Sequence, residues 1–282
     1  MTFLIQASLL SGVISVALRN QGNDLSTISR TIFLTLTTFC TYVWGARLPV
    51  PVTKVIHPLI ISALLTMGVI QGSSLAMGLP FKTYLKNYKV GTYQLFQMGA
   101  GDVMMFLLGP SVVSFSMSMF DRRKLLQENL AIVLISVMVS SVGGLFGTAA
   151  FVRCLQLGGK IGGGMIRLST LSRNVTTALA IACTNVLKGD VSLAILIVLT
   201  TGVLGATICR SVLDSLGIYD PITRGLAVGG SAQGLGVTSM IPEPDAFPFA
   251  AMSMILTAIS ATVMVSIPSI RDSLVTLAQG NL

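Results

Sequence analysis

Charged side chains are scarce in this chain, where Asp, Glu, Lys and Arg make up only 10% of 282 residues. Soluble domains carry about a quarter of such residues, so this composition excludes an ordinary soluble protein. Hydrophobic residues make up 52% of the chain, and the mean hydropathy is +0.83. The apolar residues form long runs without alternation, which favours helices over the strands of a membrane barrel. The sequence therefore predicts one all-α, polytopic transmembrane domain over residues 1–282.

Cysteine and histidine are equally sparse. Cys40, Cys154, Cys183 and Cys209 lie far apart in apolar sequence, and His57 is the only histidine. No zinc spacing or disulfide framework is present, and no acid or nucleophile is placed to complete a catalytic triad. The glycine-rich stretches lack the spacing of phosphate-binding loops. We therefore expect no enzymatic activity, no cofactor and no metal.

The net charge of +8 arises from 18 basic and 10 acidic residues. In a soluble protein this excess would suggest nucleic acid. Here the basic residues cluster in short gaps between apolar runs, as in Lys82–Lys89 and Arg122–Lys124. Such clusters are typical of loops that face anionic lipid headgroups on one side of a membrane. No nucleic-acid partner is expected.

Nine apolar segments could enter the bilayer, and several reach the roughly 20 residues that a spanning helix needs. The segments are 2–18, 31–49, 57–78, 99–120, 129–152, 175–187, 191–213, 224–240 and 246–268. Of these, 191–213 and 129–152 are the clearest spans.

Three segments contain breaks. Gly109-Pro110 interrupts 99–120, polar residues open 171–187, and glycines fill 224–240. Lipid cannot satisfy the backbone groups that a break frees, so broken segments must face protein or a wet cavity. Short, broken segments in both halves of a chain are typical of inverted-repeat transporters. For 99–120, basic clusters on both flanks favour a re-entrant hairpin over a full crossing.

The strongest candidate site is the start of the segment SRNVTTALA. Arg173 keeps its charge at any relevant pH, and Asn174, Thr176 and Thr177 follow it where a new helix would begin. A helix N-terminus presents free N–H groups that favour a carboxylate, so the four residues could form an anion seat. The alternative is an arginine that extends to the membrane surface beside ordinary N-cap residues.

Two acidic residues also allow two interpretations each. Asp102 could carry a coupling proton or cation, or it could cap a helix. Asp220 and Pro221 are typical of a helix start, with the acid as cap and proline in the first turn. Arg224 follows them, and Asp220 and Arg224 could pair with each other.

The glycine-rich stretch TRGLAVGGSAQGLGVTSM contains Gln233, with Thr238 after it. These neutral donors and acceptors could bind substrate hydroxyls. Gly234 and Gly236 would let a ligand approach the backbone. Alternatively, the glycines allow close packing between helices.

Taken together, these stretches resemble the LrgB/CidB family, and most of all the carboxy-terminal half of its plant members. The similarity covers about residues 50–275, in order, while residues 1–49 add leading spans. The stretches are HPLIISALL, GAGDVMMFLLGPSVVSFSMSMFDRRKLL, SRNVTTALAIA, VLTTGVLGA, YDPITRGLAVGGSAQGLGVTSM and FAAMSMILTAISATVMVSIPSIRDSL. The resemblance implies inverted repeats with crossed broken helices, as in cation/proton antiporters. It also implies exchange of glycolate and glycerate across the inner plastid envelope during photorespiration.

This sequence departs from the family at one candidate residue. Family members often read S-H-G-[IL]-G-T where this chain has Ser231-Ala232-Gln233-Gly234-Leu235-Gly236, so a neutral amide replaces a titratable histidine. Plant members also have a preceding membrane half that resembles the small LrgA partner. We therefore expect an LrgA-like subunit, a homo-oligomer or an incomplete chain. The first 20 residues show neither a secretory signal nor a transit peptide.

The sequence thus predicts a secondary transporter that carries small hydroxy-monocarboxylates by alternating access. Arg173 and the helix starts near Asn174 and Pro221 would hold the carboxylate. Gln233 and the threonines would address the hydroxyls. Two alternatives stay open: a holin/antiholin-like protein that controls membrane integrity, and a carrier of another monocarboxylate such as pyruvate.

Overall fold

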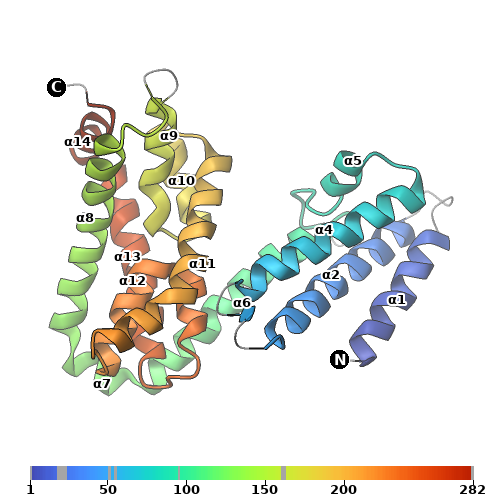
Figure 1. The fold of residues 1–282 in the computed structure, drawn as a ribbon, viewed down its shortest axis with the longest axis horizontal. Helices are drawn as coiled ribbons and strands as arrows, with labels where there is room; N and C mark the ends of the chain where they lie inside the picture. The colour runs from blue at the N-terminus through green and yellow to red at the C-terminus, as the bar shows by residue number, and fades with distance from the viewer. Residues whose placement is uncertain are drawn as a thin grey trace. The chain divides into compact units, whose positions relative to one another are not determined.

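The computed structural model describes residues 2–17, 24–49, 52–53, 56–94, 96–159 and 163–280. All the regular elements in these residues are helices, which confirms the predicted all-α class (Figure 1). The chain divides into two compact units, Met1–Ser114 and Phe115–Leu282. Among the described residues, four helices are long and apolar enough to cross a membrane: α4 (Pro58–Met77), α8 (Leu130–Cys154), α11 (Val191–Ser215) and α13 (Phe247–Ser266). The polytopic arrangement is therefore confirmed as well.

The first unit contains α1 (Thr2–Ala17), α2 (Asp24–Ala46), α4 (Pro58–Met77) and α5 (Phe81–Lys86). Hydroxyl groups join its helices in pairs. Ser8 bonds Thr37 between α1 and α2 at 3.0 Å, and Thr41 of α2 bonds both Ser62 and Thr66 of α4 at 3.0 and 3.1 Å. Such side-chain bonds and small contact residues are typical of helix packing in membranes.

The next helix, α6 (Ala100–Asp121), corrects one prediction. It continues through Pro110, so the expected break at Gly109-Pro110 and the re-entrant hairpin over 99–120 are wrong. Proline removes one backbone donor, but a membrane helix tolerates it where neighbouring groups compensate. The carbonyl that loses its N–H partner is that of Phe106, four residues before Pro110. The hydroxyl of Ser111 donates to the carbonyl of Leu107 at 2.8 Å, so it adds a bond beside the proline but does not replace the lost one.

The second unit contains short α7 (Arg123–Glu128) and the long helices α8 (Leu130–Cys154), α11 (Val191–Ser215) and α13 (Phe247–Ser266). The amphipathic helix α14 (Pro268–Gln279) follows α13. Buried side chains from these long helices, from α14 and from the segments between them form one apolar core, including Leu145, Leu171, Val198 and Leu274. Two irregular segments lie among these helices: the first packs in this core, and the second packs in a separate apolar cluster with α11 and α13.

The first irregular segment consists of α9 (Gly163–Thr170), the 3-10 turn η2 (Leu171–Asn174) and α10 (Thr177–Leu187). Val175 and Thr176 between them have extended backbones. The chain reverses direction here, and a hydrogen bond between residues on either side of the reversal shows this: the hydroxyl of Ser169 accepts from the amide of Asp190 at 2.7 Å. Ser172 likewise bonds Thr184 at 2.9 Å. Residues 163–187 therefore form a helical hairpin with its tip at Asn174. The predicted lead-in at 158–164 lies partly in residues 160–162, outside the described residues.

The second irregular segment, α12 (Pro221–Ser239), is also a hairpin. Gln233 has φ 54° and ψ −150°, far from helical values. A Cβ placed on Gly236 would lie 3.1 Å from the carbonyl oxygen of Val228. These residues would be about 12 Å apart along a straight helix, so the chain must turn back at Gln233. The predicted interruption in 224–240 is confirmed, and its position is Gln233.

The two hairpins enter the unit from opposite ends, with α9 and α10 in the upper part of Figure 1 and α12 in the lower part. Helix α11 begins at the base of the first hairpin, beside Ser169, and ends at the base of the second, where Asp214 binds Arg224. Helix α13 starts at that base and returns. Each half is thus a hairpin followed by a span, in opposite directions. The tips of the two hairpins contact each other, because Gln233 bonds the backbone carbonyl of Asn174.

Candidate substrate site at the hairpin tips

The two hairpin tips are joined by one side chain. Gln233 is only 3% exposed, and its Nε2 donates to the backbone carbonyl of Asn174. Its Oε1 atom is buried and has no hydrogen-bond partner in the described part of the chain. A buried acceptor without a donor is unfavourable by about 1–3 kcal/mol. The tip therefore presents a site for a ligand that can donate a hydrogen bond.

Helix α8 supports the first tip. The side-chain amide of Asn174 donates to the carbonyl of Ser140 at 2.8 Å. Gly144 lies one turn further along α8, and a Cβ at Gly144 would overlap the amide nitrogen of Asn174. Sequence reasoning missed both α8 residues, because neither differs from ordinary small residues in an apolar span. Together they fix the position of Asn174 and hence of its carbonyl.

Arg173 is the cation nearest this junction in sequence. It is half-buried, and its Nε donates to the hydroxyl of Thr148 at 2.8 Å. Its two terminal nitrogens make no hydrogen bond or ion pair with any residue that the structure describes. A guanidinium oriented through Nε with both terminal nitrogens available is suited to bidentate binding of a carboxylate.

The start of α10 adds backbone donors beside Arg173. Thr176 is the N-cap residue of α10, but its side chain makes no capping hydrogen bond. The first amides of a helix have no partners within the helix, so they remain available to an anion. Thr176 and Thr177 are half-buried here. The structure thus brings Arg173, Asn174, Thr176 and Gln233 to one pair of tips.

Two other predicted residues, Thr238 and Asp102, have different surroundings. Thr238 is exposed, and its hydroxyl donates to Leu235 of its own helix at 2.8 Å, so it does not face the junction. The carboxylate of Asp102 accepts backbone N–H bonds from Val90, Gly91 and Gly99 at 2.9–3.0 Å. This is the capping alternative, and it leaves coupling through Asp102 without structural support.

The helix start at Pro221 also differs from its predicted role. Asp220 caps α12 by accepting from the amide of Thr223 at 2.8 Å, and the Thr223 hydroxyl helps to hold the pKa of Asp220 below its usual range. The first turn of α12 is therefore already occupied by a carboxylate. The helix start that lies at the junction is the one after the turn at Gln233.

Arg224 does not pair with Asp220. It is 5% exposed, and it binds both oxygens of Glu243 at 2.8 Å and Asp214 at 2.7 Å. Hydrogen bonds from Arg224, with a further one from Arg210, hold the pKa of Glu243 below its usual range. Because its donors are occupied, Arg224 anchors the base of the second hairpin, in keeping with its predicted structural role.

The glycines after Gln233 differ from one another. A Cβ on Gly234 would meet only the sulfur of Met254, at 3.8 Å, whereas a Cβ on Gly236 would overlap Ala232 in the other arm. Gly236 therefore serves packing inside the hairpin. Gly234 has room around it, so only Gly234 is suited to exposing backbone to a ligand.

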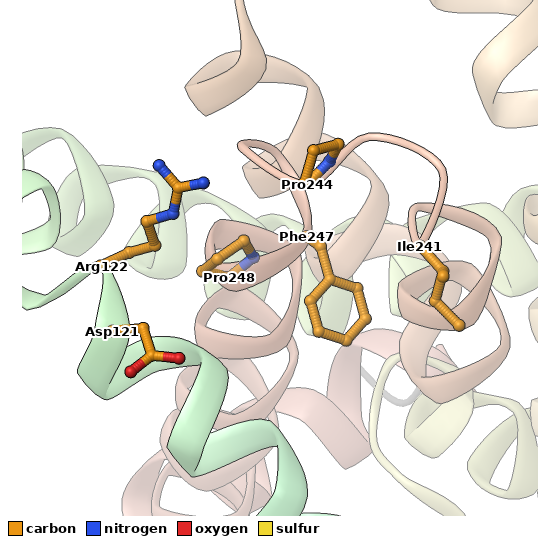
Figure 2. Close-up of a pocket in the computed structure, with 6 residues that line it drawn as sticks. All are labelled: Asp121, Arg122, Ile241, Pro244, Phe247 and Pro248. Carbon is orange, nitrogen blue, oxygen red and sulfur yellow. The ribbon is translucent and has the colours of Figure 1, made fainter.

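A surface cavity of about 280 Å³ lies near the base of the second hairpin (Figure 2). Its lining residues are Asp121, Arg122, Ile241, Pro244, Phe247 and Pro248. Arg122 is already paired with Asp245 at 2.9 Å. The cavity therefore offers no unpaired cation among its lining residues, and it is a poorer carboxylate site than the tips.

Comparison with known proteins identifies the family of this chain. A family model for LrgB-like proteins matches residues 38–269. The chain belongs to the LrgB-like family. This LrgB-like chain is 37% identical over 258 residues to plastidal glycolate/glycerate translocator 1, chloroplastic, from Arabidopsis thaliana. The alignment covers 89% of this chain and 49% of that protein, so the chain spans about half the length of this relative. No solved structure matches. Family and apolar helices together identify an integral membrane protein.

Proposed function

We propose that this protein is a secondary transporter of small 2-hydroxy-monocarboxylates such as glycolate and glycerate. The observation that carries the proposal is the junction of the hairpin tips. Gln233 Oε1 lacks a donor there, and Arg173, next in sequence to Asn174, has two terminal nitrogens without a partner in the described residues. A hydroxy acid supplies both missing groups: its carboxylate binds Arg173 and its hydroxyl donates to Gln233. The similarity to a glycolate/glycerate translocator supports the same substrates.

The opposite directions of the two hairpins support transport by alternating access. Two hairpins that enter from opposite ends leave one site between their tips, and each arm can open that site to its own side. The carboxylate would bind Arg173 and the free amides at the start of α10. The substrate hydroxyls would bind Gln233, with Thr176 and Thr177 at the rim. Gly234 would allow the backbone after Gln233 to approach the substrate.

Location and partners belong to this proposal as well. The name of the Arabidopsis relative supports a chloroplast location, for which we propose the inner envelope and a role in photorespiration. That relative is about twice as long as the aligned region. We therefore propose that an LrgA-like membrane subunit, or a second copy of this chain, works with the present unit.

The test is counter-exchange in liposomes loaded with unlabelled glycerate. Wild-type protein is expected to take up labelled glycolate with saturation, and unlabelled glycerate outside is expected to compete. Arg173→Gln should reduce exchange at least about tenfold, because a charged hydrogen-bond pair contributes roughly 1.5–3 kcal/mol. Arg153→Gln, at the end of α8, is the matched control and should retain exchange.

Two results would contradict the proposal. Exchange that is unchanged in Arg173→Gln would remove this residue from the site. Flux that does not saturate, together with leakage of an encapsulated dye, would favour the holin-like alternative. Competition by pyruvate as strong as that by glycolate would leave transport intact but change the substrate class.

A further inference from the structure

The first unit contains a cavity that the proposed transport function does not use. Its volume is about 540 Å³, within the range of small-molecule sites, and it lies between α1, α2, α4 and α5. Most of its wall is apolar, with contributions from Val13, Phe33, Ala76 and Met77. A space of this kind, formed by hydrophobic helices, is suited to an acyl chain.

The same cavity has a polar end. Tyr84 lines it and is fully buried, and its hydroxyl has no hydrogen-bond partner at bonding geometry, although Ser73 lies beside it. Arg30 interacts electrostatically with Tyr84, and its buried Nε atom also lacks a partner. Arg30 lies one helical turn before Phe33, so both residues lie on the same face of α2.

No carboxylate neutralises this arginine within the described side chains. Asp24 and Asp102 are the acidic residues before Ser114, and of these the structure describes the side chain of Asp102 alone. Three backbone amides already occupy its oxygens. A buried or half-buried charge inside a membrane protein is unfavourable unless an opposite charge or acceptor accompanies it. Two unsatisfied donors beside an apolar space therefore indicate an anionic head attached to an apolar tail.

We propose that this cavity binds an anionic amphiphile, with its acyl chain along the apolar wall and its carboxylate or phosphate on Arg30 and Tyr84. The guanidinium donates through Nε and the tyrosine donates through its hydroxyl. This site is separate from the hairpin tips and does not depend on the transport proposal.

The test uses the full chain, purified in neutral detergent and stripped of lipid. Binding of palmitate and of hexadecanol, which shares its chain but has no charge, is measured by native mass spectrometry and calorimetry. Palmitate should bind at least about tenfold more tightly. Phosphatidylglycerol and phosphatidylcholine form a second pair, which separates a phosphate headgroup from a free carboxylate as the natural source of the anion.

Four variants locate the site. Arg30→Gln and Tyr84→Phe should reduce the preference for the charged partner in each pair, without removing binding of hexadecanol. Gly72→Leu should weaken binding of both, because Gly72 lines the cavity and a Cβ there meets only open space. Gly68→Leu is the matched control, since it lies one turn earlier on α4 with equally open surroundings and does not line the cavity.

Three results would overturn the proposal. Equal affinity for the two members of both pairs, the anionic one and the one without net charge, would remove the anion requirement. Unchanged binding in Gly72→Leu, or an equal loss in Gly68→Leu, would place the amphiphile elsewhere. Preserved thermal stability of each variant in detergent confirms that loss of binding is not loss of fold.

Discussion

At the scale of single residues, Gln233 combines two unfavourable features. Its φ of 54° with ψ of −150° lies in a region that non-glycine residues rarely adopt, at a cost of about 1–3 kcal/mol. Its Oε1 is also buried without a donor. Such features persist where surrounding structure enforces them, and they cluster at functional sites. Here the bond to Asn174 and the reversal of the chain enforce both.

The first prediction concerns selectivity at Gln233. Gln233→Leu preserves side-chain size but removes the acceptor, so the preference for glycolate over acetate should fall about tenfold, the effect of roughly 1.4 kcal/mol. Competition by each acid against labelled glycerate measures this ratio. Gln156→Leu is the control, because Gln156 also has positive φ, 46°, but is exposed. A ratio that stays constant in Gln233→Leu would show that the amide does not address the hydroxyl.

Sequence alone could identify some of these residues, and physical reasons explain the others. Arg173 and Gln233 stand out because a permanent charge and an amide are rare in apolar segments. Ser140, Thr148 and Gly144 do not stand out, because their roles depend on facing a tip that lies about 30 residues away in sequence. Asp102 was ambiguous, since a carboxylate that caps backbone amides and one that carries a proton look alike in sequence.

At the scale of elements, the length of each broken segment was the useful signal. The segment 171–187 is too short to span a bilayer, and in the structure it forms a hairpin together with α9. The sequence did not place the second turn at Gln233, because neighbouring glycines are better suited to positive φ. The predicted break at Pro110 is wrong, since a proline alone does not determine whether a membrane helix ends.

The second prediction concerns the contact between α8 and the first tip. Gly144→Ala should lower thermal stability and exchange, because the added methyl group would overlap the amide of Asn174. Gly143→Ala is the control in the same helix, with no atom within 4 Å of an added Cβ, and should be neutral or slightly stabilising. Thermal unfolding in detergent and counter-exchange measure both variants. Equal behaviour of the two would show that Asn174 is not held in this way.

At the scale of the whole molecule, paired broken segments predicted an inverted repeat with crossed broken helices, and the structure of the second unit shows two hairpins in contact at their tips. Whether two broken helices cross or two hairpins meet depends on whether the chain continues or reverses at each break. That choice is made by contacts such as Ser169 with Asp190 and Gly236 with Val228. The sequence contains no local signal for contacts of this kind.

The third prediction tests this topology. In a cysteine-free background, Lys188→Cys and Tyr219→Cys should react with a membrane-impermeant thiol reagent from opposite sides of sealed vesicles. Both positions are exposed, and the single span α11 separates them. Asp190→Cys should label from the same side as Lys188→Cys. Labelling of positions 188 and 219 from one side would contradict the opposite entry of the hairpins.

The ion pairs that Arg224 makes with Asp214 and Glu243 have a consequence for insertion of the protein into the membrane. The second hairpin starts and finishes at the same end of the unit, where Arg224 binds Asp214 before the hairpin and Glu243 after it. These three charged residues can therefore stay at one membrane surface while the hairpin is inserted. Carrying an arginine to the centre of a bilayer costs about 2.5–3.5 kcal/mol. Under the proposed function this penalty applies to Arg173, which lies at the tip of a short helical hairpin and not within a long span.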